Sequence, residues 1–518
     1  MKFRVTYSVL SADLEELHKE FDGVLEKVRA RQGGEYPSWI NGKPHLSGRI
    51  IENRNPADTR QLLGRFHAAP ADKLDEAVRA AREAQKGWGR TPWQERVQVI
   101  RRAADKISEN RLELAAIMAL ETGKNRMESL GDVEEAADLF RYYASQLEES
   151  NGFLKPLGKL SPNEDTRSVL RPLGVFAVIS PFNFPLALPV GMTGGALLGG
   201  NAAILKPSED TPWCAHRLLE ILRDAGLPDG LFQVMHGDGS LGAALVRHPG
   251  VDGVAFTGSK EVGMDILHAL QAVYPKPCLL EMGGKNPAII CKDADLSKAV
   301  EGCYRSAFGL SGQKCSALSR VLIHKSLKDQ FLARLVERTR GTKIGDPTEK
   351  DTYVGPVINR KAVERYVAAA ALARRDGNVL IGGQALTEPA ALSHGFFVAP
   401  TIAELPRGHR LFRDELFLPF LVVDTFDSLD EAIALANDCD YGLTAGVFSE
   451  RKEDVEAFMD QVQAGVLYAN RQTGATTGAW PGVQAFCGWK GSGATGKGGC
   501  GPYYVSQFMR EQSQTRMG

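Results

Sequence analysis

The sequence of 518 residues predicts an α/β protein with two lobes. Short apolar runs alternate with helical stretches after Arg167, and a second alternation of the same kind covers about 286–470. Alternating strands and helices indicate parallel sheets. Strands that are short and continuously apolar are typical of sheets covered on both faces. Two such blocks in succession predict two lobes with a cleft between them.

The N-terminal part of the chain is predicted to be mostly helical. Apolar positions recur at intervals of three to four residues over 11–31, which gives this helix one apolar face. The segment 35–64 is rich in Pro, Gly and Asn and is expected to mix short strands with loops. Four more helices are predicted at 71–88, 93–109, 110–122 and 131–149.

Each of the two later blocks contains five predicted strands. In the first block the strands cover 175–179, 202–205, 231–235, 253–256 and 278–280, with helices at 185–199, 211–225, 240–247 and 260–273. In the second block the strands cover 288–291, 321–324, 397–402, 421–425 and 465–469, with helices at 295–309, 326–339, 359–376 and 428–437. The run Tyr-Tyr-Val-Ser-Gln-Phe within 502–509 is expected to be one more strand, with an open edge if unpaired.

Composition leaves several classes of protein without support. The net charge is -1 and the pI is about 6.8, so no basic excess indicates a nucleic-acid or membrane partner. No apolar run reaches the roughly 18 residues that span a bilayer, and the N-terminus has no signal-peptide or transit-peptide pattern. The eight cysteines form no CxxC pair and no cluster at metal-ligand spacing. We expect a cytoplasmic protein with free thiols and no metal.

Cys315 is a candidate nucleophile. It lies in Gly-Leu-Ser-Gly-Gln-Lys-Cys-Ser-Ala, residues 309–317. The thiolate is the reactive form of cysteine, and it needs exposure and an electropositive setting. The flanking glycines permit close approach of a substrate, and the N-terminus of a following helix would favour the anion. A lone cysteine is more often a buried structural thiol, but the neighbouring residues favour the nucleophile here.

Two more polar residues are candidates, and one of them, Glu281, lies at a predicted strand end, where α/β proteins gather their sites. Glu281, in Leu-Leu-Glu-Met-Gly-Gly-Lys-Asn-Pro at 279–287, is a candidate general base that would activate water. Asn183 lies in Ile-Ser-Pro-Phe-Asn-Phe-Pro at 179–185, and its amide together with the backbone N–H of Cys315 would suit an oxyanion hole. A salt-bridged glutamate and an ordinary turn asparagine are the structural alternatives.

Two further segments are candidates for binding a dinucleotide. Phe-Thr-Gly-Ser-Lys-Glu-Val-Gly at 256–263 follows a strand and opens a helix, whose N-terminus can hold a pyrophosphate. It lacks the GxGxxG pattern, so an ordinary strand-to-helix turn with Ser259 as N-cap explains it equally well. Lys206 and Glu209, in Leu-Lys-Pro-Ser-Glu, would bind a ribose or lie exposed as surface charges.

These motifs, in this order, resemble the aldehyde dehydrogenase superfamily from about Tyr36 to Gln514. Glu281 precedes Cys315 by 34 residues, as the base precedes the nucleophile in that family. The resemblance implies a Rossmann-type NAD-binding domain (1–149 and 169–280), an α/β catalytic domain (281–488) and a small β oligomerisation flap (150–168 and 489–518). It also implies a homo-oligomer that acts on a small-molecule aldehyde.

The same resemblance assigns roles to individual residues. Cys315 would be the nucleophile, Glu281 the general base and Asn183 the oxyanion-hole amide. The implied cofactor-binding residues are Ser180, Pro181, Phe182, Lys206, Ser208, Glu209, Gly239, Phe256, Gly258, Ser259, Glu415 and Phe417. A carboxylate at Glu209 suits a free ribose 2′-hydroxyl better than a 2′-phosphate, which favours NAD over NADP.

Within the superfamily the chain resembles the 1-pyrroline-5-carboxylate dehydrogenase branch. Three segments carry this resemblance: Gly-Gln-Lys-Cys-Ser-Ala, Leu-Tyr-Ala-Asn-Arg at 467–471 leading into Thr-Thr-Gly-Ala at 476–479, and Arg-Tyr-Tyr-Ala at 141–144. The branch implies oxidation of L-glutamate γ-semialdehyde to L-glutamate in proline catabolism. The implied substrate-binding residues are Phe184, Ser316, Gly478, Ala479 and Phe486; the hydroxyl and backbone N–H groups would hold the α-carboxylate.

Several positions depart from the family pattern. Ala485 and Cys487 replace the usual Pro and Gly, about three extra residues precede Thr476, Leu418 replaces a Gly, and Phe182 replaces a Trp. Three alternatives therefore stay open: another small aldehyde such as succinate semialdehyde, acyl transfer to coenzyme A, and a non-enzymatic dinucleotide-binding protein. A proline-oxidising partner is also compatible with the sequence, although no such domain is present in this chain.

Overall fold

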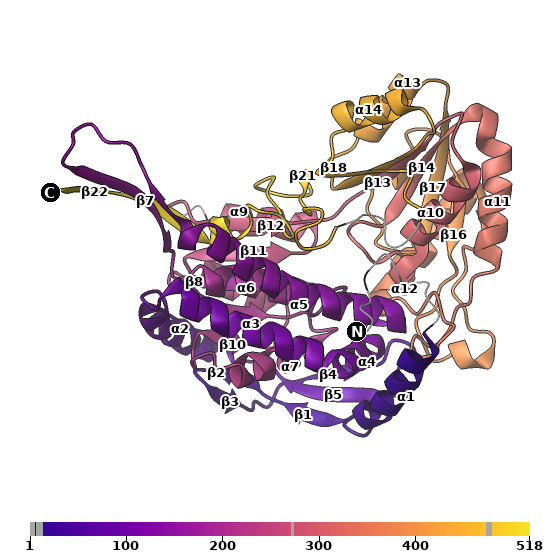
Figure 1. The fold of residues 1–518 in the computed structure, drawn as a ribbon. Helices are drawn as coiled ribbons and strands as arrows, with labels where there is room; N and C mark the ends of the chain where they lie inside the picture. The colour runs from indigo at the N-terminus through magenta and orange to yellow at the C-terminus, as the bar shows by residue number, and fades with distance from the viewer. Residues whose placement is uncertain (1–5, 7–13, 271–273, 473–478) are drawn as a thin grey trace.

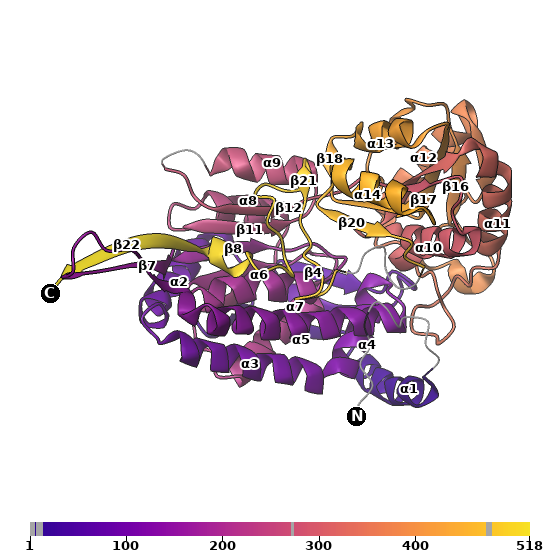
Figure 2. The ribbon, with the colours of Figure 1, turned by 45° about the horizontal axis from the view of Figure 1, so that its top comes forward.

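The computed structural model describes residues 6, 14–270, 274–472 and 479–518. It shows two lobes, each built around a seven-stranded sheet (Figures 1 and 2). A narrow antiparallel sheet that contains β7 and β22 projects from the first lobe. The alternation of strands and helices in the sequence therefore predicted the two lobes correctly.

The first sheet has the strand order β12-β11-β8-β9-β10-β2-β3. Its five parallel strands are β8 (Val175–Ile179), β9 (Ala202–Lys206), β10 (Phe232–Val234), β11 (Gly253–Thr257) and β12 (Cys278–Glu281). The short strands β2 (Ser38–Ile40) and β3 (Lys43–His45) add an antiparallel edge. Every residue of β9 and β10 is buried, as expected for a sheet covered on both faces.

Two sets of helices belong to this lobe. The helices that follow the parallel strands are α6 (Ala187–Leu198), α7 (Pro212–Asp224), α8 (Gly239–Arg247) and α9 (Lys260–Ala269). The N-terminal helices are α1 (Glu15–Arg29), α2 (Leu74–Trp88), α3 (Trp93–Glu109), α4 (Arg111–Thr122) and α5 (Arg126–Glu149). Helix α5 packs against α3, α4 and α6, and α6 lies between α5 and the sheet (Figure 1).

Helix α5 begins five residues earlier than the sequence predicts. Asn125 caps it, because the side-chain oxygen of Asn125 accepts the backbone N–H of Glu128 at 3.0 Å. The extra first turn carries charged residues that are nevertheless buried, so its apolar periodicity is too weak to recognise. Glu128, in this first turn, lines a pocket of the candidate site.

The second lobe contains a sheet of order β15-β16-β17-β14-β13-β19-β20. Its strands are β13 (Asn286–Ile290), β14 (Leu318–His324), β15 (Asn378–Ile381), β16 (Thr401–Glu404), β17 (Phe420–Phe426), β19 (Thr444–Phe448) and β20 (Val466–Ala469). All pair in parallel except β15, which is antiparallel to β16. The helices are α10 (Leu296–Phe308), α11 (Lys328–Arg340), α12 (Arg360–Asp376), α13 (Leu429–Asn437) and α14 (Lys452–Gln461).

In this lobe the sequence prediction differs from the structure at several elements. Strands β15 and β19 and helix α14 were not predicted, and the strand expected over 397–402 begins at Thr401. The preceding residues bond elsewhere: Phe397 accepts the N–H of Leu386 at 2.9 Å, and Ala399 donates to Gln384 at 3.0 Å. Pro400 has no N–H to give, so the sheet pairing starts only after it.

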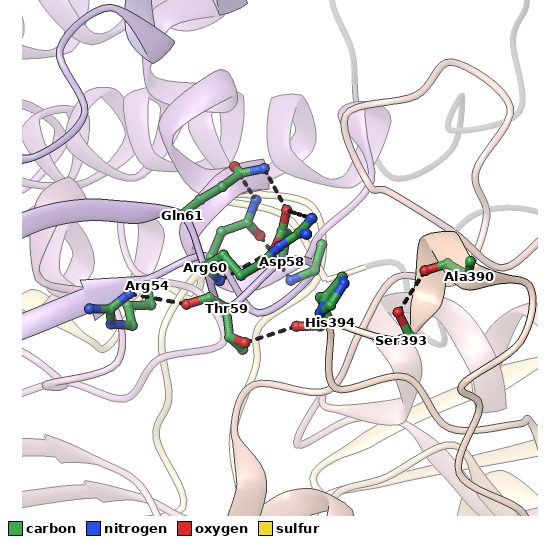
Figure 3. Close-up of polar contacts among 10 residues, drawn as sticks. Arg54, Asp58, Thr59, Arg60, Gln61, Ala390, Ser393 and His394 are labelled. Atoms are coloured by element: carbon green, nitrogen blue, oxygen red, sulfur yellow. Dashed lines mark hydrogen bonds and ion pairs between the residues drawn. The ribbon is translucent and has the colours of Figure 1, made fainter.

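Two loops join the lobes away from the cleft (Figure 3). Thr59 donates both its N–H and its hydroxyl to the carbonyl oxygen of His394, each at 2.9 Å. Asp58 accepts two bonds from the guanidinium of Arg60 at 2.8 Å, which keeps the first loop closed. That guanidinium lowers the pKa of Asp58 to about 2. The loop follows β4 (Ile50–Arg54), which pairs with β5 (Leu62–His67) beside β1 (Gly34–Tyr36).

The projecting sheet consists of β6 (Leu154–Pro156), β7 (Glu164–Pro172) and β22 (Met509–Met517), in the order β22-β7-β6. Strands β7 and β22 pair antiparallel over their whole length (Figure 2). The aromatic run before β22 is not a strand, contrary to the prediction. It forms a 3-10 turn, Val505–Phe508, because the ring of Phe508 packs against Phe176 at 5.0 Å in the core.

In the described part of the chain, no helix combines the length and the apolar character that a bilayer crossing requires. No group of three or more His, Cys, Asp or Glu side chains there is arranged to hold a metal ion. The eight cysteines are all free thiols, five of them buried.

Candidate active site

The strand order of the first sheet places a crevice at its centre. Of its parallel strands, β8 comes first in the chain; β9 and β10 follow on one side of it, and β11 and β12 on the other. The connections therefore leave β8 and β11 in opposite directions, which opens a crevice at their carboxyl ends, where such sheets bind ligands. The segments that directly follow these two strands, 181–183 and 258–259, line a cleft at this position.

The cleft has a volume of about 1070 Å³ and takes its lining from both lobes. Among the residues predicted from the sequence, it is lined by Pro181, Phe182, Asn183, Gly258, Ser259, Cys315, Glu415 and Phe417. Phe417 adopts a left-handed backbone conformation, with φ of 57°, which is rare for a bulky residue. Its ring meets the ring of Phe182 edge-on at 5.8 Å, so aromatic side chains of the two lobes touch across the cleft.

One end of helix α9 borders the cleft. Ser259 is its N-cap, and the serine hydroxyl accepts the N–H of Val262 at 3.3 Å. Ser259, Lys260 and Glu261 all line the cleft. The other backbone N–H groups of the first turn have no partner within the helix, so this end can bind an anion. Both sequence interpretations of Ser259, as helix cap and as cleft residue, are compatible with this arrangement.

Glu415 extends from the second lobe to the end of β12. Its Oε1 accepts the backbone N–H of Gly284 at 2.9 Å. A Cβ atom on Gly283 would lie 1.9 Å from the other carboxylate oxygen, so only glycine permits this approach. Burial raises the pKa of Glu415 to about 7, and the bond from Gly284 and the charge of Lys285 oppose that rise.

A second cavity, of about 130 Å³, adjoins the cleft and is walled by α5 and α6. Cys315 lines both cavities, as do Thr257 and Met282, so Cys315 lies where the two meet. Five more residues predicted from the sequence line the small pocket: Phe184, Glu281, Ser316, Ala479 and Phe486. Asn183 and Glu281 thus lie on different sides of the thiol, one in each cavity.

The loop that carries Cys315 has an unusual backbone. After α10 the chain forms a 3-10 turn, Gly309–Gly312, in which Leu310 and Ser311 both have left-handed conformations. The side-chain amide of Asn286 donates to the carbonyl oxygen of Cys315 at 2.7 Å and fixes the end of the loop. Burial raises the pKa of the Cys315 thiol to about 12, and the carboxylates of Glu415 and Glu281 add to this rise.

Glu281 is the last residue of β12, and its main chain bridges to Gly493. Its Oε2 atom is shielded from solvent and has no hydrogen-bond partner among the described residues. Burial raises the pKa of Glu281 well above its usual range. A carboxyl group in this setting is a strong proton acceptor once it is ionised, which is the property a general base needs.

A thiol between a large cleft and a small pocket, flanked by an amide and a buried carboxyl, agrees with the family that the motifs resemble. The sequence profile described as "Aldehyde dehydrogenase family" matches residues 40–513. This chain belongs to the aldehyde dehydrogenase family. The α/β fold expected from the resemblance is confirmed.

Several relatives of this aldehyde dehydrogenase carry a specific name. A protein of Geobacillus sp. (strain WCH70) named 1-pyrroline-5-carboxylate dehydrogenase is 36% identical over 506 residues, which cover 96% of each chain. One of Halalkalibacterium halodurans, named 1-pyrroline-5-carboxylate dehydrogenase 1, has the same identity and coverage. The expected resemblance to this branch is confirmed.

Solved structures agree. A 1-pyrroline-5-carboxylate dehydrogenase from Thermus with bound NAD matches with a TM-score of 0.93 and 32% identity, covering 100% of this chain and 99% of that one. Proline utilization A from Bdellovibrio bacteriovorus matches with a TM-score of 0.92 and 35% identity. That match covers 97% of this aldehyde dehydrogenase and 52% of the other chain, so the present chain spans about half its length.

Some residues predicted to bind the cofactor lie outside both cavity linings. Lys206 ends β9, Ser208 and Glu209 follow it, and Gly239 begins α8; all four lie outside the lined part of the cleft. Lys206 and Glu209 form an ion pair of 4.0 Å. Ser180 and Phe256 are buried next to the cleft rather than facing it. Gly478 lies outside the described residues.

The aldehyde dehydrogenase pocket also contains residues that the sequence did not single out. These are Lys124, Glu128, Glu135, Tyr143, Lys314, Cys500 and Tyr504. Glu128, Glu135 and Tyr143 lie on α5, and Lys124 directly precedes its N-cap. Most of the surface of this helix is buried, although it carries carboxylates. Charged residues recurring every three to four positions among apolar ones were the available signal, because a buried charge needs a partner or a function.

Proposed function

We propose that this aldehyde dehydrogenase oxidises L-glutamate γ-semialdehyde, the open form of 1-pyrroline-5-carboxylate, to L-glutamate with NAD. The observation that carries the proposal is the position of Cys315 at the junction of a dinucleotide-sized cleft and a small pocket lined by charges of both signs. The names of the relatives at 36% identity over nearly the whole chain support the same substrate.

The cleft suits NAD. The N-terminus of α9 would hold the pyrophosphate, and Glu415 and Phe417 would hold the nicotinamide ribose and ring. Bound NAD supplies the hydride acceptor. At the adenosine end, Glu209 is half exposed and would accept a bond from a ribose 2′-hydroxyl, whereas it would repel a 2′-phosphate. We therefore propose NAD rather than NADP.

The chemical steps follow from three side chains. The Cys315 thiol gives its proton to solvent water, and the resulting thiolate sulfur attacks the aldehyde carbon. The side-chain amide of Asn183 donates to the resulting oxyanion, an interaction typically worth about 3 kcal/mol. After hydride departure a thioester remains on Cys315. Glu281 then takes a proton from water, the water oxygen attacks the thioester carbonyl, and the carboxylic acid leaves as the thiol is restored.

The small pocket fits an amino acid end. Lys124 and Lys314 line it together with Glu128 and Glu135, and Ser316 adds a hydroxyl beside the thiol. A substrate with both an α-carboxylate and an α-ammonium group matches two signs of charge, whereas succinate semialdehyde presents only a carboxylate. Phe184 and Phe486 supply apolar walls for the carbon chain between the two ends.

Initial rates of NADH formation over a panel of aldehydes test the proposal. We expect kcat/KM for glutamate semialdehyde to exceed that for succinate semialdehyde and propanal by roughly 100-fold, because succinate semialdehyde lacks the ammonium group and propanal lacks both charged groups that the pocket would bind. NAD should be used in preference to NADP. Cys315→Ala should lower turnover on the order of 10⁴-fold or more.

Two results would contradict this proposal in different ways. A preference for succinate semialdehyde would retain the chemistry and change the substrate. Full turnover by Cys315→Ala would reject the nucleophile itself. Added coenzyme A should yield no acyl-CoA product, since Glu281 directs water to the thioester.

We also propose that the enzyme is a homo-oligomer. Strand β22 is an edge strand of the projecting sheet, and no other described strand pairs with its outer side along nine residues. Leu160, between β6 and β7, is 99% exposed, and Met517 in β22 is 69% exposed. An exposed edge with apolar side chains is a surface that a second chain can cover. Sedimentation of the full chain against a chain shortened by residues 509–518 measures this, and a monomeric full chain would reject it.

A further inference from the structure

Helix α5 carries two buried carboxylates one helical turn apart, and each bonds a different wall of the site. Oε1 of Glu128 accepts the backbone N–H of Leu310 at 2.8 Å. Oδ1 of Asp132 accepts the backbone N–H of Ala187 at 2.8 Å. Glu128 is 9% exposed and Asp132 is fully buried. Neither residue takes part in the bond-making steps proposed above, although Glu128 also lines the pocket, and buried carboxylates are retained only where they are well bonded.

The Glu128 bond supports the loop of the nucleophile. Leu310 lies five residues before Cys315 and has φ of 50°, and Ser311 has φ of 52°. Non-glycine residues persist in this conformation only where the surroundings enforce it. The hydroxyl of Ser311 donates to the carbonyl oxygen of Gly355 at 2.8 Å, so the strained turn is held from α5 on one side and from within its own lobe on the other.

The Asp132 bond supports the segment of the amide. Ala187 is the first residue of α6 and lies four residues after Asn183. The second oxygen of Asp132 pairs with the ammonium of Lys124 at 2.6 Å. That ammonium lies 3.7 Å from the centroid of the Phe184 ring, which directly follows Asn183. Asp132 therefore restrains this segment through a backbone bond and through the lysine that faces it.

We propose that Glu128 and Asp132 are positioning residues that set the separation between the Cys315 thiol and the Asn183 amide. A helix rises about 6 Å over four residues and is far stiffer than either loop. Two anchors on one helix thus relate two segments that are more than a hundred residues apart in the chain and belong to different lobes. This inference rests on the proposed function, because it assumes that sulfur and amide act together.

The nearby charges belong to the same arrangement. A Cβ atom on Gly309 would lie 2.9 Å from both Oε1 of Glu128 and Nζ of Lys314, so these two side chains meet over the glycine. Lys314 directly precedes Cys315 and is 7% exposed. Replacing Glu128 by Gln keeps an oxygen for Leu310 and removes the charge, whereas replacing it by Ala removes both.

The experiment compares Glu128→Ala and Glu128→Gln with a matched buried carboxylate. Glu121 on α4 is fully buried and accepts the N–H groups of Trp213 and Cys214 at 2.9 and 3.0 Å, away from both cavities. Glu121→Ala and Glu121→Gln therefore impose a similar loss of packing without touching the site. The readouts are kcat, KM for NAD, and the rate at which iodoacetamide alkylates the peptide that contains Cys315.

We expect Glu128→Ala to lower kcat and the alkylation rate of Cys315 by ~10- to 100-fold while KM for NAD stays within about twofold, because reacting groups misplaced by about 1 Å lose rates of this order. Glu128→Gln should recover most of both losses. The Glu121 variants should keep both rates within about threefold of the wild type. A packing change in the core away from the site lowers stability but does not reorient the loop that carries Cys315.

Three outcomes would overturn the inference: unchanged rates in Glu128→Ala, equal losses in Glu121→Ala, or equal losses in the Ala and Gln variants of Glu128. The alkylation rate needs no turnover, so it reports on the loop even if the substrate is another aldehyde. Full activity of Cys315→Ala would instead reject the proposed function, and the two failures are therefore distinguishable.

Discussion

The two cavities that meet at Cys315 are built in different ways. The cleft, of about 1070 Å³, is formed by turns at the carboxyl ends of strands and closed by the second lobe. The pocket, of about 130 Å³, is formed by side chains on the faces of α5 and α6 and by the loop of the nucleophile. The first follows from sheet topology and suits a cofactor shared by a whole family. The second depends on individual side chains and sets which aldehyde enters.

The two cavities also differ in how well their buried carboxylates are hydrogen-bonded. Glu415 in the cleft is satisfied by the N–H of Gly284, and its pKa rises only to about 7. Oε2 of Glu281 in the pocket has no hydrogen-bond partner among the described residues, and burial raises the pKa of Glu281 well above its usual range. Carboxylates that only bind are held by hydrogen bonds, whereas a carboxylate that must accept a proton is left poorly solvated.

The largest expected effect, after loss of the thiol itself, is at Glu281. Glu281→Gln should lower steady-state turnover by roughly 10²- to 10⁴-fold, the usual contribution of a general base. Formation of the first NADH per site should survive, because the thioester forms before water is needed. Rapid mixing would show a burst of NADH followed by a slow phase. A variant that loses burst and steady state equally would place Glu281 in the first step instead.

The pH dependence sharpens that prediction. Because burial raises the pKa of Glu281, the wild-type steady-state rate should increase with pH through that raised pKa, as the base becomes ionised. Residual turnover of Glu281→Gln should lack this increase. Identical pH profiles of the two proteins would assign the titration to another group.

A smaller effect is expected at the pocket's hydroxyl. Ser316→Ala should lower kcat/KM for glutamate semialdehyde by roughly 10-fold, the value of one hydrogen bond to a charged group. The rate with propanal, which has no carboxylate, should stay within about twofold, since the lost bond has no partner there. Equal losses for both aldehydes would mean that Ser316 supports Cys315 rather than the substrate.

The sequence predicts the strand ends and loops around both cavities better than the helix faces that wall the pocket, for physical reasons. Strand β8 matches its prediction at both ends, because an apolar run followed by Ser-Pro is a local signal. Cys315 and Glu281 stand out because glycines beside a polar residue at a strand end or loop are local as well. The left-handed backbone of Phe417 depends on the opposite lobe and leaves no such signal.

The pocket residues of α5 were missed because helix prediction relies on an apolar stripe. Glu128 is buried and Glu135 is half-buried, on a helix whose faces are nearly all covered, so the polar positions that usually mark the solvent side do not do so here. Lys206 and Glu209 show the opposite case, in which the sequence singles out residues that the cleft lining does not include. Their motif predicts a ribose site, and the structure places them at the end of β9 but outside the lined cleft.

The smallest expected effect is at Glu415, and it is an effect on the stability of the fold rather than on the rate of the reaction. The folded state binds a proton at Glu415 with a pKa of about 7, whereas the ordinary value is 4.5. A group whose pKa is raised on folding lowers stability as pH increases between those two values, because the unfolded chain releases its proton first. Below about pH 4.5 there is no penalty, and above about pH 7 the penalty is constant.

Glu415→Gln cannot ionise and escapes this penalty. Its midpoint of thermal unfolding should therefore rise relative to the wild type by a few degrees between about pH 5 and pH 7, and the difference should stay level at higher pH. Asp58→Asn is the control, because the pKa of Asp58 shifts in the opposite direction: the ion pair with Arg60 lowers it to about 2. Asp58→Asn should differ from the wild type by a constant amount over the same range, because Asp58 is ionised throughout in both folded and unfolded chains. A pH-independent difference for Glu415→Gln would mean that the Glu415 carboxylate is already ionised at pH 5, and its hydrogen bond to Gly284 would then outweigh burial.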